Sequence, residues 1–365
     1  MKKVMLVFGT RPEAIKMCPL VLELKARSDI ETRVCVTGQH REMLSQVLEA
    51  FGVTPDYDLS VMTDKQTLFD VTEKVMRGMQ GILSGTKPDV VLVHGDTTTT
   101  FAAALACFYM NIPVGHVEAG LRTYDIASPF PEEFNRQAVD IVTRFLFAPT
   151  EVSKANLLKE GKAEASIFVT GNTAIDALKT TVRRDYRHPE LNWASDSRLV
   201  MLTAHRRENL GQPMRRIFGA IRRIVEEFPD IKIIYPVHMN PAVREAASEV
   251  LGGHGRVHLI EPLDVLDFHN FLARSYIILT DSGGIQEEAP SLGKPVLVLR
   301  DTTERPEGVA AGTLKLTGTD EETIYREFKT LLVDKAAYDA MSHASNPYGD
   351  GYASRRIADI LEEKL

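Results

Sequence analysis

The sequence predicts an α/β protein built from two doubly wound parallel sheets, and chain length and a repeated strand–helix rhythm are the observations that predict it. The chain has 365 residues, which suits about two domains of roughly 100–200 residues each. Short β-branched apolar runs alternate with longer helical patterns, as in βαβ units. The rhythm restarts once, so we expect two Rossmann-like domains, residues 1–170 and 171–352, and a final helix at 353–365 that packs back on the first.

The strands are expected in short apolar runs, each bounded by turn residues or a helical pattern. Those of the first domain are Val4–Phe8, Thr32–Thr37, Val90–His94, Val114–Val117, Phe145–Ala148 and Ile167–Thr170. Those of the second domain are Leu199–Thr203, Ile231–Val237, Val257–Ile260, Ile277–Thr280 and Val296–Leu299. Met214–Phe228 has helical spacing, Gly171–Thr173 is the expected hinge, and Arg183–Asp196 is expected to be a polar surface loop.

Composition and charge disfavour several classes of protein. The chain carries 43 Lys and Arg against 50 Asp and Glu, a net charge of −7, so no nucleic-acid partner is expected. The apolar run at residues 4–9 stops short of a signal peptide, and no membrane partner is expected. Cys18, Cys35 and Cys107 are odd in number and lie in apolar segments, which indicates reduced thiols and a cytoplasmic protein.

Polar residues gather where the expected strands end. Doubly wound sheets bind ligands outside the carboxyl ends of their strands, so the active site is expected in the cleft between the two domains. The segments that carry these polar residues are Gly9–Glu13, Gly95–Thr98, Glu118–Thr123, Thr203–Asn209 and Asp281–Gln286.

Ser282, Gly283 and Gly284 follow an apolar strand and open a helix. Small residues there let backbone N–H groups surround an anion, so a phosphate group is expected. Glu287 and Glu288 could accept hydrogen bonds from ribose hydroxyls, or they could simply complement the helix dipole.

Arg11 and Lys16 lie at the start of the first expected helix, where cations oppose the helix dipole. A diphosphate would explain them, and pairing with a carboxylate is the alternative. The chain has neither the P-loop pattern nor the three-glycine dinucleotide fingerprint, which disfavours ATP chemistry and bound NAD.

Three carboxylates are expected to converge on the same sheet edge: Asp96, Glu118, and either Glu132 or Glu133. Grouped carboxylates raise one another's pKa, so one can act as an acid while another acts as a base. Asp96 could alternatively be a helix cap. Arg122 and Arg136 could balance the negative charge, and Arg136 is within i,i+4 reach of Glu132.

The second domain carries a matching group of donors. His205 and Arg206 follow an expected strand and His238 ends another, which favours an anionic ligand, although His205 alone could be a loop histidine bonded to a carbonyl. Metal is not expected, because the sequence has no H-E-x-x-H or C-x-x-C spacing.

Seven segments share their order and residues with a known family. They are Gly9–Ala14, His94–Thr99, His116–Arg122, Pro131–Glu133, His205–Glu208, Asp281–Glu288 and Asp301–Pro306. Together they resemble the non-hydrolysing UDP-N-acetylglucosamine 2-epimerases over essentially the whole chain. The resemblance implies the glycosyltransferase-B fold, a homodimer, no cofactor, and reversible interconversion of UDP-N-acetylglucosamine and UDP-N-acetylmannosamine through bound UDP and a 2-acetamidoglucal, for bacterial cell-envelope polysaccharide synthesis.

The resemblance also implies roles for single residues. Acid and base carboxylates correspond to Asp96, Glu118 and Glu132, without assignment to a face of the sugar, and His205 corresponds to the histidine near the diphosphate. Substrate and UDP contacts correspond to Arg11, Lys16, Arg136, Ser282, Gly283, Gly284, Glu288 and Arg305.

Some family members bind a second UDP-N-acetylglucosamine as an activator. The corresponding positions here are Gln39, His40, Glu42, Lys65, Arg206 and His238. Glu42 and Lys65 stand where glutamine and arginine are expected, and a carboxylate beside a diphosphate is unfavourable unless a cation offsets it.

Three other functions remain compatible with the fold. A glycosyltransferase shares the nucleotide-binding half, a hydrolysing epimerase would release UDP and free sugar, and a nucleotide-sugar sensor would bind without turnover. The grouping of Asp96, Glu118, Glu132 and His205 favours an epimerase over a sensor.

Overall fold

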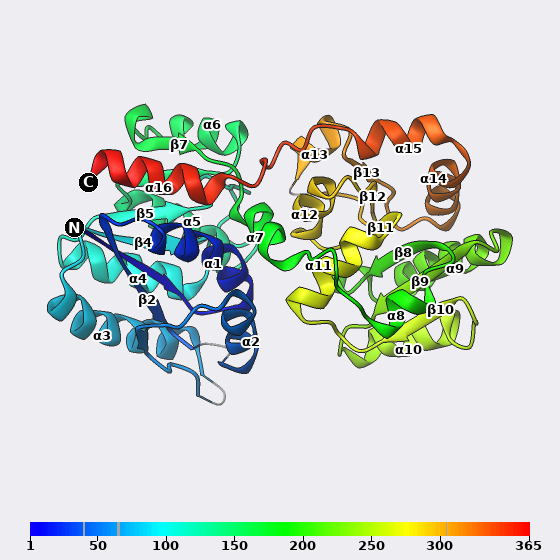
Figure 1. The fold of residues 1–365 in the computed structure, drawn as a ribbon, viewed down its shortest axis with the longest axis horizontal. Coiled ribbons are helices and arrows are strands. Elements are labelled where there is room, and N and C mark those ends of the chain that lie inside the picture. Colours follow the sequence, from blue (N-terminus) through cyan, green and yellow to red (C-terminus); the bar gives the residue numbers. More distant parts are fainter. Residues whose placement is uncertain (39–40, 64–65, 304) are drawn as a thin grey trace. The chain divides into compact units, whose positions relative to one another are not determined.

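Two parallel sheets with helices between successive strands make up the chain, which confirms the predicted α/β class with two Rossmann-like domains (Figure 1). The structure, a computed structural model, describes residues 1–38, 41–63, 66–303 and 305–365, with the side chains of residues 41–43 outside this description. The first unit holds residues 1–180 and 348–365, and the second holds residues 181–347.

The described part of the first unit contains a seven-stranded sheet in the order β3-β2-β1-β4-β5-β6-β7, with every pair parallel. The order reverses direction at β1 and β4, as in doubly wound sheets that bind ligands at such a point. The strands are β1 (Lys2–Phe8), β2 (Ile30–Val36), β3 (Tyr57–Asp58), β4 (Val90–His94), β5 (Val114–Val117), β6 (Phe145–Ala148) and β7 (Ile167–Val169).

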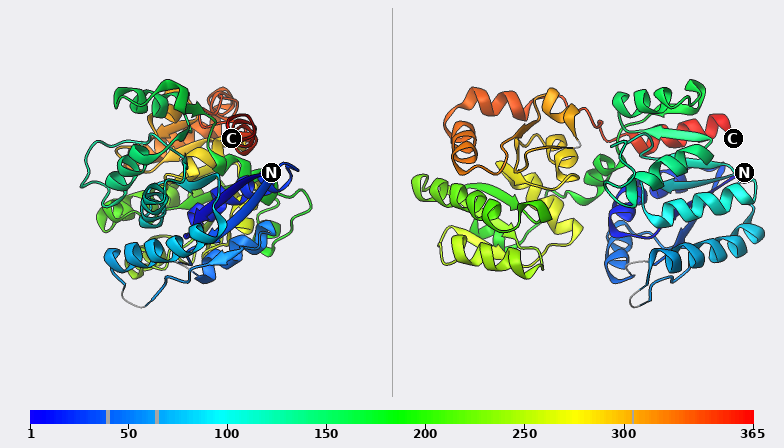
Figure 2. Two further views of the ribbon diagram at one scale, coloured as in Figure 1. Left: turned by 90° about the vertical axis from the view of Figure 1, so that its left-hand side faces the viewer. Right: turned by 180° about the vertical axis from the view of Figure 1, so that it is seen from behind.

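The helices of the first unit begin at side-chain caps in several places. Thr10 caps α1 in a capping box with Glu13, and Thr97 caps α4, which satisfies N–H groups that would otherwise lack partners. The last helix, α16, packs beside α1 (Figures 1 and 2), where Arg27 pairs with Asp359 and Glu362. The helices are α1 (Arg11–Lys25), α2 (Arg41–Phe51), α3 (Leu68–Thr86), α4 (Thr98–Tyr109), α5 (Glu132–Val142), α6 (Glu151–Lys159), α7 (Thr173–Thr181), α16 (Ala353–Lys364) and the 3₁₀ turn η1 (Glu164–Ser166).

The described part of the second unit contains a six-stranded parallel sheet in the order β10-β9-β8-β11-β12-β13. Its strands are β8 (Arg198–Thr203), β9 (Ile231–Pro236), β10 (Val257–Ile260), β11 (Ile277–Thr280), β12 (Val296–Val298) and β13 (Leu314–Leu316). Its helices are α8 (Pro189–Trp193), η2 (Arg207–Asn209), α9 (Gln212–Glu227), α10 (Pro241–Leu251), α11 (Val265–Arg274), α12 (Ile285–Ser291), α13 (Pro306–Ala310), α14 (Glu321–Val333) and α15 (Lys335–Ser342).

The segment Arg183–Asp196 is not simply the polar surface loop that the sequence predicts. It contains α8, and Leu191 and Trp193 pack against the hydrophobic cluster around Phe271. The Trp193 ring also stacks on His258 with centroids 3.5 Å apart. Two apolar side chains in a charged segment were too weak a pattern to show this packing, but their burial attaches the segment to the core.

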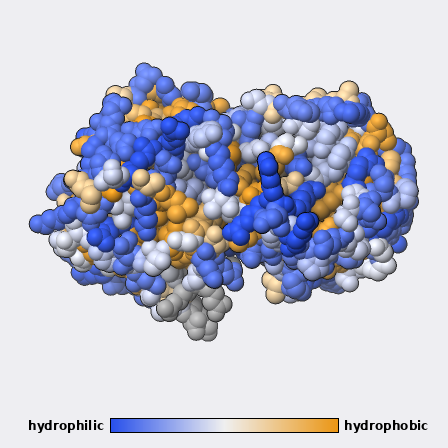
Figure 3. Space-filling model, viewed as in Figure 1, coloured by the Kyte–Doolittle hydropathy of each residue, from blue (hydrophilic) through white to orange (hydrophobic). Residues whose placement is uncertain are grey.

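Apolar side chains of helices and strands form the core of each unit. Cys18, Cys35 and Cys107 are buried in the first unit, as predicted. Hydrophilic residues cover most of the visible face of each unit, with apolar residues scattered among them (Figure 3). Among the described helices, none is both long and apolar enough to cross a membrane.

Candidate active site

The carboxyl ends of β4 and β5 bring two predicted carboxylates to the same level of the sheet. His94 lies opposite Val117 in the parallel register, so Asp96 and Glu118 follow neighbouring strands. Gly95 (φ 68°) and Glu118 (φ 71°) both have left-handed backbone conformations. Glycine adopts this conformation readily, whereas a glutamate is strained by roughly 1–3 kcal/mol. Such strain persists only where surrounding contacts hold the residue in place.

The Glu118 carboxylate is held by side chains from two other elements. Lys16 of α1 forms an ion pair with Glu118 Oε1, and Asn172 Nδ2 donates to the same oxygen over 3.1 Å. His94 Nε2 lies 3.8 Å from Glu118 Oε2, and burial lowers the pKa of His94 to about 3 despite the opposing effect of Glu118. A neutral imidazole and an ammonium group therefore flank this carboxylate.

Asp96 is the carboxylate with the clearest proton-transfer properties. Burial raises the pKa of Asp96 to about 6, with Arg136 opposing the rise and Glu118 and Glu132 adding to it. Arg136 Nη1 bonds to Asp96 Oδ2 over 2.7 Å, and Asn135 Nδ2 donates to the Asp96 backbone carbonyl over 2.8 Å. A carboxyl group with a pKa near neutrality can both give and take a proton.

Glu132 and Glu133, left as alternatives by the sequence, differ in their surroundings. Glu133 is buried and accepts hydrogen bonds from the backbone N–H groups of residues 123 and 124, from Gln137 and from Arg136. Although burial raises the pKa of Glu133, these four donors outweigh it and hold the pKa below its usual range. Arg136 therefore pairs with Glu133 and Asp96 rather than with Glu132, which corrects the expected i,i+4 pair.

No role is predicted for Glu13 from the sequence. In the structure it connects the β1–α1 turn to the β4–α4 turn at the carboxyl edge of the sheet. Its Oε2 accepts hydrogen bonds from the backbone N–H groups of Gly9 and Thr10 at 2.9 and 2.7 Å. Its Oε1 accepts from the hydroxyls of Thr97 and Thr100 at 2.6 and 3.0 Å. The buried carboxylate thus fixes the β1–α1 turn against the start of α4. The T-x-x-E capping-box pattern could have revealed part of this role.

Arg11, the other predicted residue of this turn, is the first residue of α1 and is half-buried. Thr97, not Asp96, caps α4, so the cap alternative for Asp96 does not hold. The first unit therefore brings Lys16, Asp96, Glu118 and Arg136 together, with Glu132 close enough to raise the pKa of Asp96.

The second unit repeats the arrangement at the ends of β8 and β11. Thr203 lies opposite Thr280, so the segments that begin at residues 204 and 281 leave the sheet side by side. The buried carboxylate of Asp281 accepts hydrogen bonds from the backbone N–H groups of His205 and Arg206 at 2.8 and 2.9 Å and from Asn209 Nδ2 at 3.1 Å. Asp281 is thus the residue that holds the His205 loop.

The His205 ring stacks on the His238 ring with centroids 5.3 Å apart. Burial lowers the pKa of His205, with His238 and Arg206 adding to the effect and Asp281 opposing it. A neutral imidazole can donate a hydrogen bond from one ring nitrogen and accept one at the other. Its side chain is 39% exposed, so the ring is accessible to a ligand.

The Ser282-Gly283-Gly284 turn lies against Arg305. A Cβ atom on Gly283 would lie 3.3 Å from the Arg305 guanidinium carbon, so a side chain there would crowd this cation. Arg305 Nε bonds to the buried Glu287 over 2.7 Å, which orients the guanidinium beside the turn. Glu288 faces His269 Nε2 at 3.6 Å. Of the two predicted ribose-binding carboxylates, Glu287 is therefore the one that positions Arg305.

The predicted activator residues are only partly described. Gln39, His40 and Lys65, and the side chain of Glu42, lie outside the described residues. Arg206 Nε donates to the Asp281 carbonyl over 3.3 Å, and His238 stacks on His205. These two residues therefore belong to the same loop cluster as His205.

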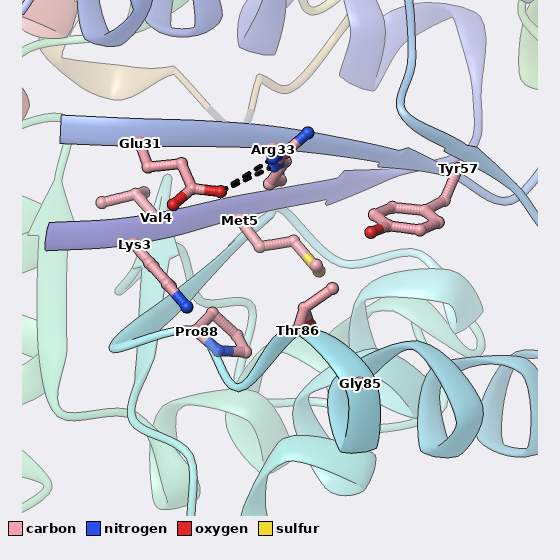
Figure 4. A pocket seen from close by; sticks show the side chains of 9 residues that line it. All are labelled: Lys3, Val4, Met5, Glu31, Arg33, Tyr57, Gly85, Thr86 and Pro88. Carbon is pink, nitrogen blue, oxygen red and sulfur yellow. Dashed lines mark hydrogen bonds and ion pairs between the residues drawn. The ribbon is translucent and has the colours of Figure 1, made fainter. Parts of the chain in front are cut away.

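A pocket elsewhere in the first unit is not part of this site. It lies toward the amino-terminal halves of β1 and β2, and Figure 4 shows Arg33 bonded to Glu31 at its edge. The candidate carboxylates lie beyond the opposite ends of the strands. Within the described ranges, no three His, Cys, Asp or Glu side chains are arranged to hold a metal ion.

The two parallel sheets, each with charged and polar residues at its carboxyl edge, have the glycosyltransferase-B fold of solved UDP-N-acetylglucosamine 2-epimerases. The family model described as UDP-N-acetylglucosamine 2-epimerase matches residues 22–362. The chain belongs to this family.

Individual relatives match over nearly their whole length. The UDP-N-acetylglucosamine 2-epimerase of Bacillus subtilis is 64% identical, with 98% of this chain and 94% of the relative covered. The S. aureus protein solved with UDP is 55% identical, with a TM-score of 0.89 over 100% of this chain and 96% of that chain. The Neisseria meningitidis UDP-GlcNAc 2-epimerase bound to UDP-GlcNAc is 48% identical, with a TM-score of 0.89 over 99% of this chain and 100% of that chain.

Proposed function

We propose that this chain reversibly epimerises UDP-N-acetylglucosamine at C2 to give UDP-N-acetylmannosamine, without net hydrolysis. The observation that carries the proposal is the pairing of Asp96 and Glu118 with cationic side chains at one sheet edge, in a chain of the 2-epimerase family. The ligands of the related structures, UDP and UDP-GlcNAc, support the substrate class.

The chemistry at C2 requires an elimination. The C2 hydrogen is not acidic, because no carbonyl group is attached to the ring carbons. In the proposed anti elimination, a carboxylate removes the C2 proton while the C1–O bond breaks, which leaves 2-acetamidoglucal and UDP. UDP then adds back to C1 as C2 receives a proton on its opposite face. Bonds and charges balance over the cycle, and no oxidant or reductant is needed.

Asp96, Glu118 and Glu132 are the proposed acid and base groups. The pKa of Asp96, about 6 because of burial, suits a group that exchanges a proton near neutral pH. Lys16 and Arg136 stabilise and orient the carboxylates of Glu118 and Asp96.

The departing diphosphate needs donors that stabilise its charge. Arg11, Ser282, Gly283, Gly284, Arg305 and His205 are the proposed contacts. Support comes from the packing of Arg305 against the Gly283 turn and from the exposure of the His205 side chain, whose ring can donate a hydrogen bond. Glu288 is the proposed ribose contact. The proposed domain boundaries lie near residues 170 and 352.

Three further features belong to the proposal through the family resemblance. A second UDP-N-acetylglucosamine would bind as an activator near Arg206 and His238, which lie in the His205 cluster. The enzyme would act as a cytoplasmic homodimer, and its product would supply cell-envelope polysaccharide synthesis.

Proton NMR of the enzyme with UDP-N-acetylglucosamine tests the reaction class. We expect anomeric signals of UDP-N-acetylmannosamine to grow until both nucleotide sugars reach constant proportions, with free UDP staying substoichiometric to product. Continued accumulation of UDP and free sugar would indicate a hydrolase instead. Demonstrated binding with an unchanged spectrum would overturn the proposal in favour of a sensor or a transferase that needs an acceptor.

A further inference from the structure

A buried histidine of β5 bonds through both of its ring nitrogens. His116 is fully buried. Its Nδ1 lies 2.6 Å from Asp140 Oδ1, and its Nε2 lies 2.7 Å from the carbonyl oxygen of Gly95. His116 therefore links α5, which carries Asp140, to the turn that immediately precedes Asp96.

Asp140 continues this link into a chain of alternating charges. Its Oδ2 bonds to Arg122 Nη2 over 2.6 Å and to the Gly120 N–H over 3.3 Å. Arg122, whose side chain is fully buried, in turn bonds through Nε to Glu160 over 2.6 Å. Although burial raises the pKa of Asp140, His116 and Arg122 outweigh it and hold the pKa below its usual range. The Arg122 guanidinium is thus shared between the Asp140 and Glu160 carboxylates.

The hydrogen-bond partners orient the His116 ring. The carbonyl oxygen of Gly95 can only accept, so Nε2 donates to it, while Nδ1 faces the Asp140 carboxylate. Because both ring nitrogens have a partner, the ring holds the Gly95 carbonyl at a fixed distance from α5.

Gly95 lies next to both Asp96 and Glu118. Its N–H donates to the Val117 carbonyl over 3.0 Å, while its own carbonyl accepts from His116. Asp96 is the next residue in the chain. A Cβ atom on Gly95 would lie 3.4 Å from Glu118 Oε2, so the Glu118 carboxylate lies on the open side of Gly95.

We propose that His116, held by Asp140, is a positioning residue that fixes the Gly95 peptide and thereby the spacing of Asp96 and Glu118. The inference rests on the proposed function, because it assigns His116 to the support of the acid and base groups. His116 itself is fully buried and touches no reacting atom. Its effect belongs to the chemical step and not to UDP binding, since the proposed UDP contacts lie on other segments.

Two substitutions test the two hydrogen bonds of the His116 ring separately. His116→Gln can place an amide nitrogen near the position of Nε2, so it can still donate to the Gly95 carbonyl. His116→Asn can place its amide nitrogen near Nδ1, so it keeps Asp140 but loses Gly95. We expect H116N to lower kcat by about 10- to 100-fold, the loss that misplacement of a catalytic group by about 1 Å can cause, while H116Q retains clearly more activity. KM and the UDP dissociation constant should change by less than about threefold in both.

Asp140→Asn tests the bond at the other ring nitrogen. Because this substitution weakens the contact that holds Nδ1, we expect it to lower kcat while the UDP dissociation constant stays nearly unchanged. His258→Asn is the matched control, because His258 also pairs with a carboxylate, that of Glu190, at 2.5 Å but lies in the second unit.

The outcomes distinguish this inference from the proposed function. Wild-type turnover tests the function by itself. An active wild type with equal kcat in H116N, or with H116Q impaired as strongly as H116N, overturns the positioning role alone. If H116N does not fold, D140N carries the test, and wild-type kcat in that variant contradicts the inference.

Discussion

Arg136 sets the electrostatic environment of Asp96, so its removal should move the pH profile of turnover. An opposite charge within about 4–6 Å lowers a carboxyl pKa by roughly 1–3. The Asp96 side chain is 28% exposed, so the lower end of that range applies. Arg136→Met should therefore raise the pKa of Asp96 from about 6 to about 7 or slightly above.

The substitution should also reduce stability. Arg136 pairs with Glu133, whose side chain is fully buried, over 2.8 Å, and removing one partner of a buried pair costs about 3 kcal/mol. At roughly 2–4 °C for each kcal/mol in a domain of this size, Tm should fall by about 6–12 °C. Assays at 25 °C should therefore be made on folded enzyme, which circular dichroism can verify.

The assay is kcat measured from pH 5 to pH 9. The limb that reports Asp96 should move to higher pH by about one pH unit in R136M, whichever of the acid or base roles Asp96 performs. Arg198→Met is a matched control, because Arg198 bonds to Asp230 over 2.7 Å in the second unit. Superimposable pH profiles for the wild type and R136M would refute the reasoning about Asp96.

Three further substitutions test other parts of the site. Asp96→Asn should lower kcat by about 100- to 10,000-fold with the UDP dissociation constant nearly unchanged, and near-normal turnover would remove its acid–base role. Arg305→Ala should weaken UDP binding by roughly 1.5–3 kcal/mol in calorimetry, and an unchanged dissociation constant would exclude Arg305 from the diphosphate site. Glu13→Gln should cost about 1–3 kcal/mol in denaturant unfolding, because its amide group cannot accept all four hydrogen bonds; unchanged stability would contradict the linking role of Glu13.

The apolar strand runs were the most predictable part of the fold. Val90–His94, Val114–Val117, Phe145–Ala148, Val257–Ile260 and Ile277–Thr280 form strands with the predicted ends. Continuous β-branched runs leave little choice of structure when both faces of a sheet are buried. The edge strands β3 and β13 were not predicted, because each is short and contains a charged residue, Asp58 or Lys315, in place of a continuous apolar run.

The candidate site was predictable as a set of positions but not as a set of contacts. Parallel strands place their carboxyl ends together, so the grouping of Asp96 and Glu118 follows from topology. Nothing in sequence spacing shows that Arg136 pairs with Glu133, because residues three and four apart are both neighbours on a helix. The His116–Asp140 bond joins residues 24 apart, and such partners depend on how α5 packs against β5.

The solvent origin of the C2 proton is the most direct test of the account. Wild-type enzyme and UDP-N-acetylglucosamine should be incubated in deuterated water, and UDP-N-acetylmannosamine should be analysed for deuterium at C2 at early times. Because the proton is removed from one face and supplied to the other by different groups, we predict deuterium at C2 in essentially every product molecule. UDP-N-acetylmannosamine that retains the original C2 hydrogen would contradict proton transfer by the carboxylates around Asp96.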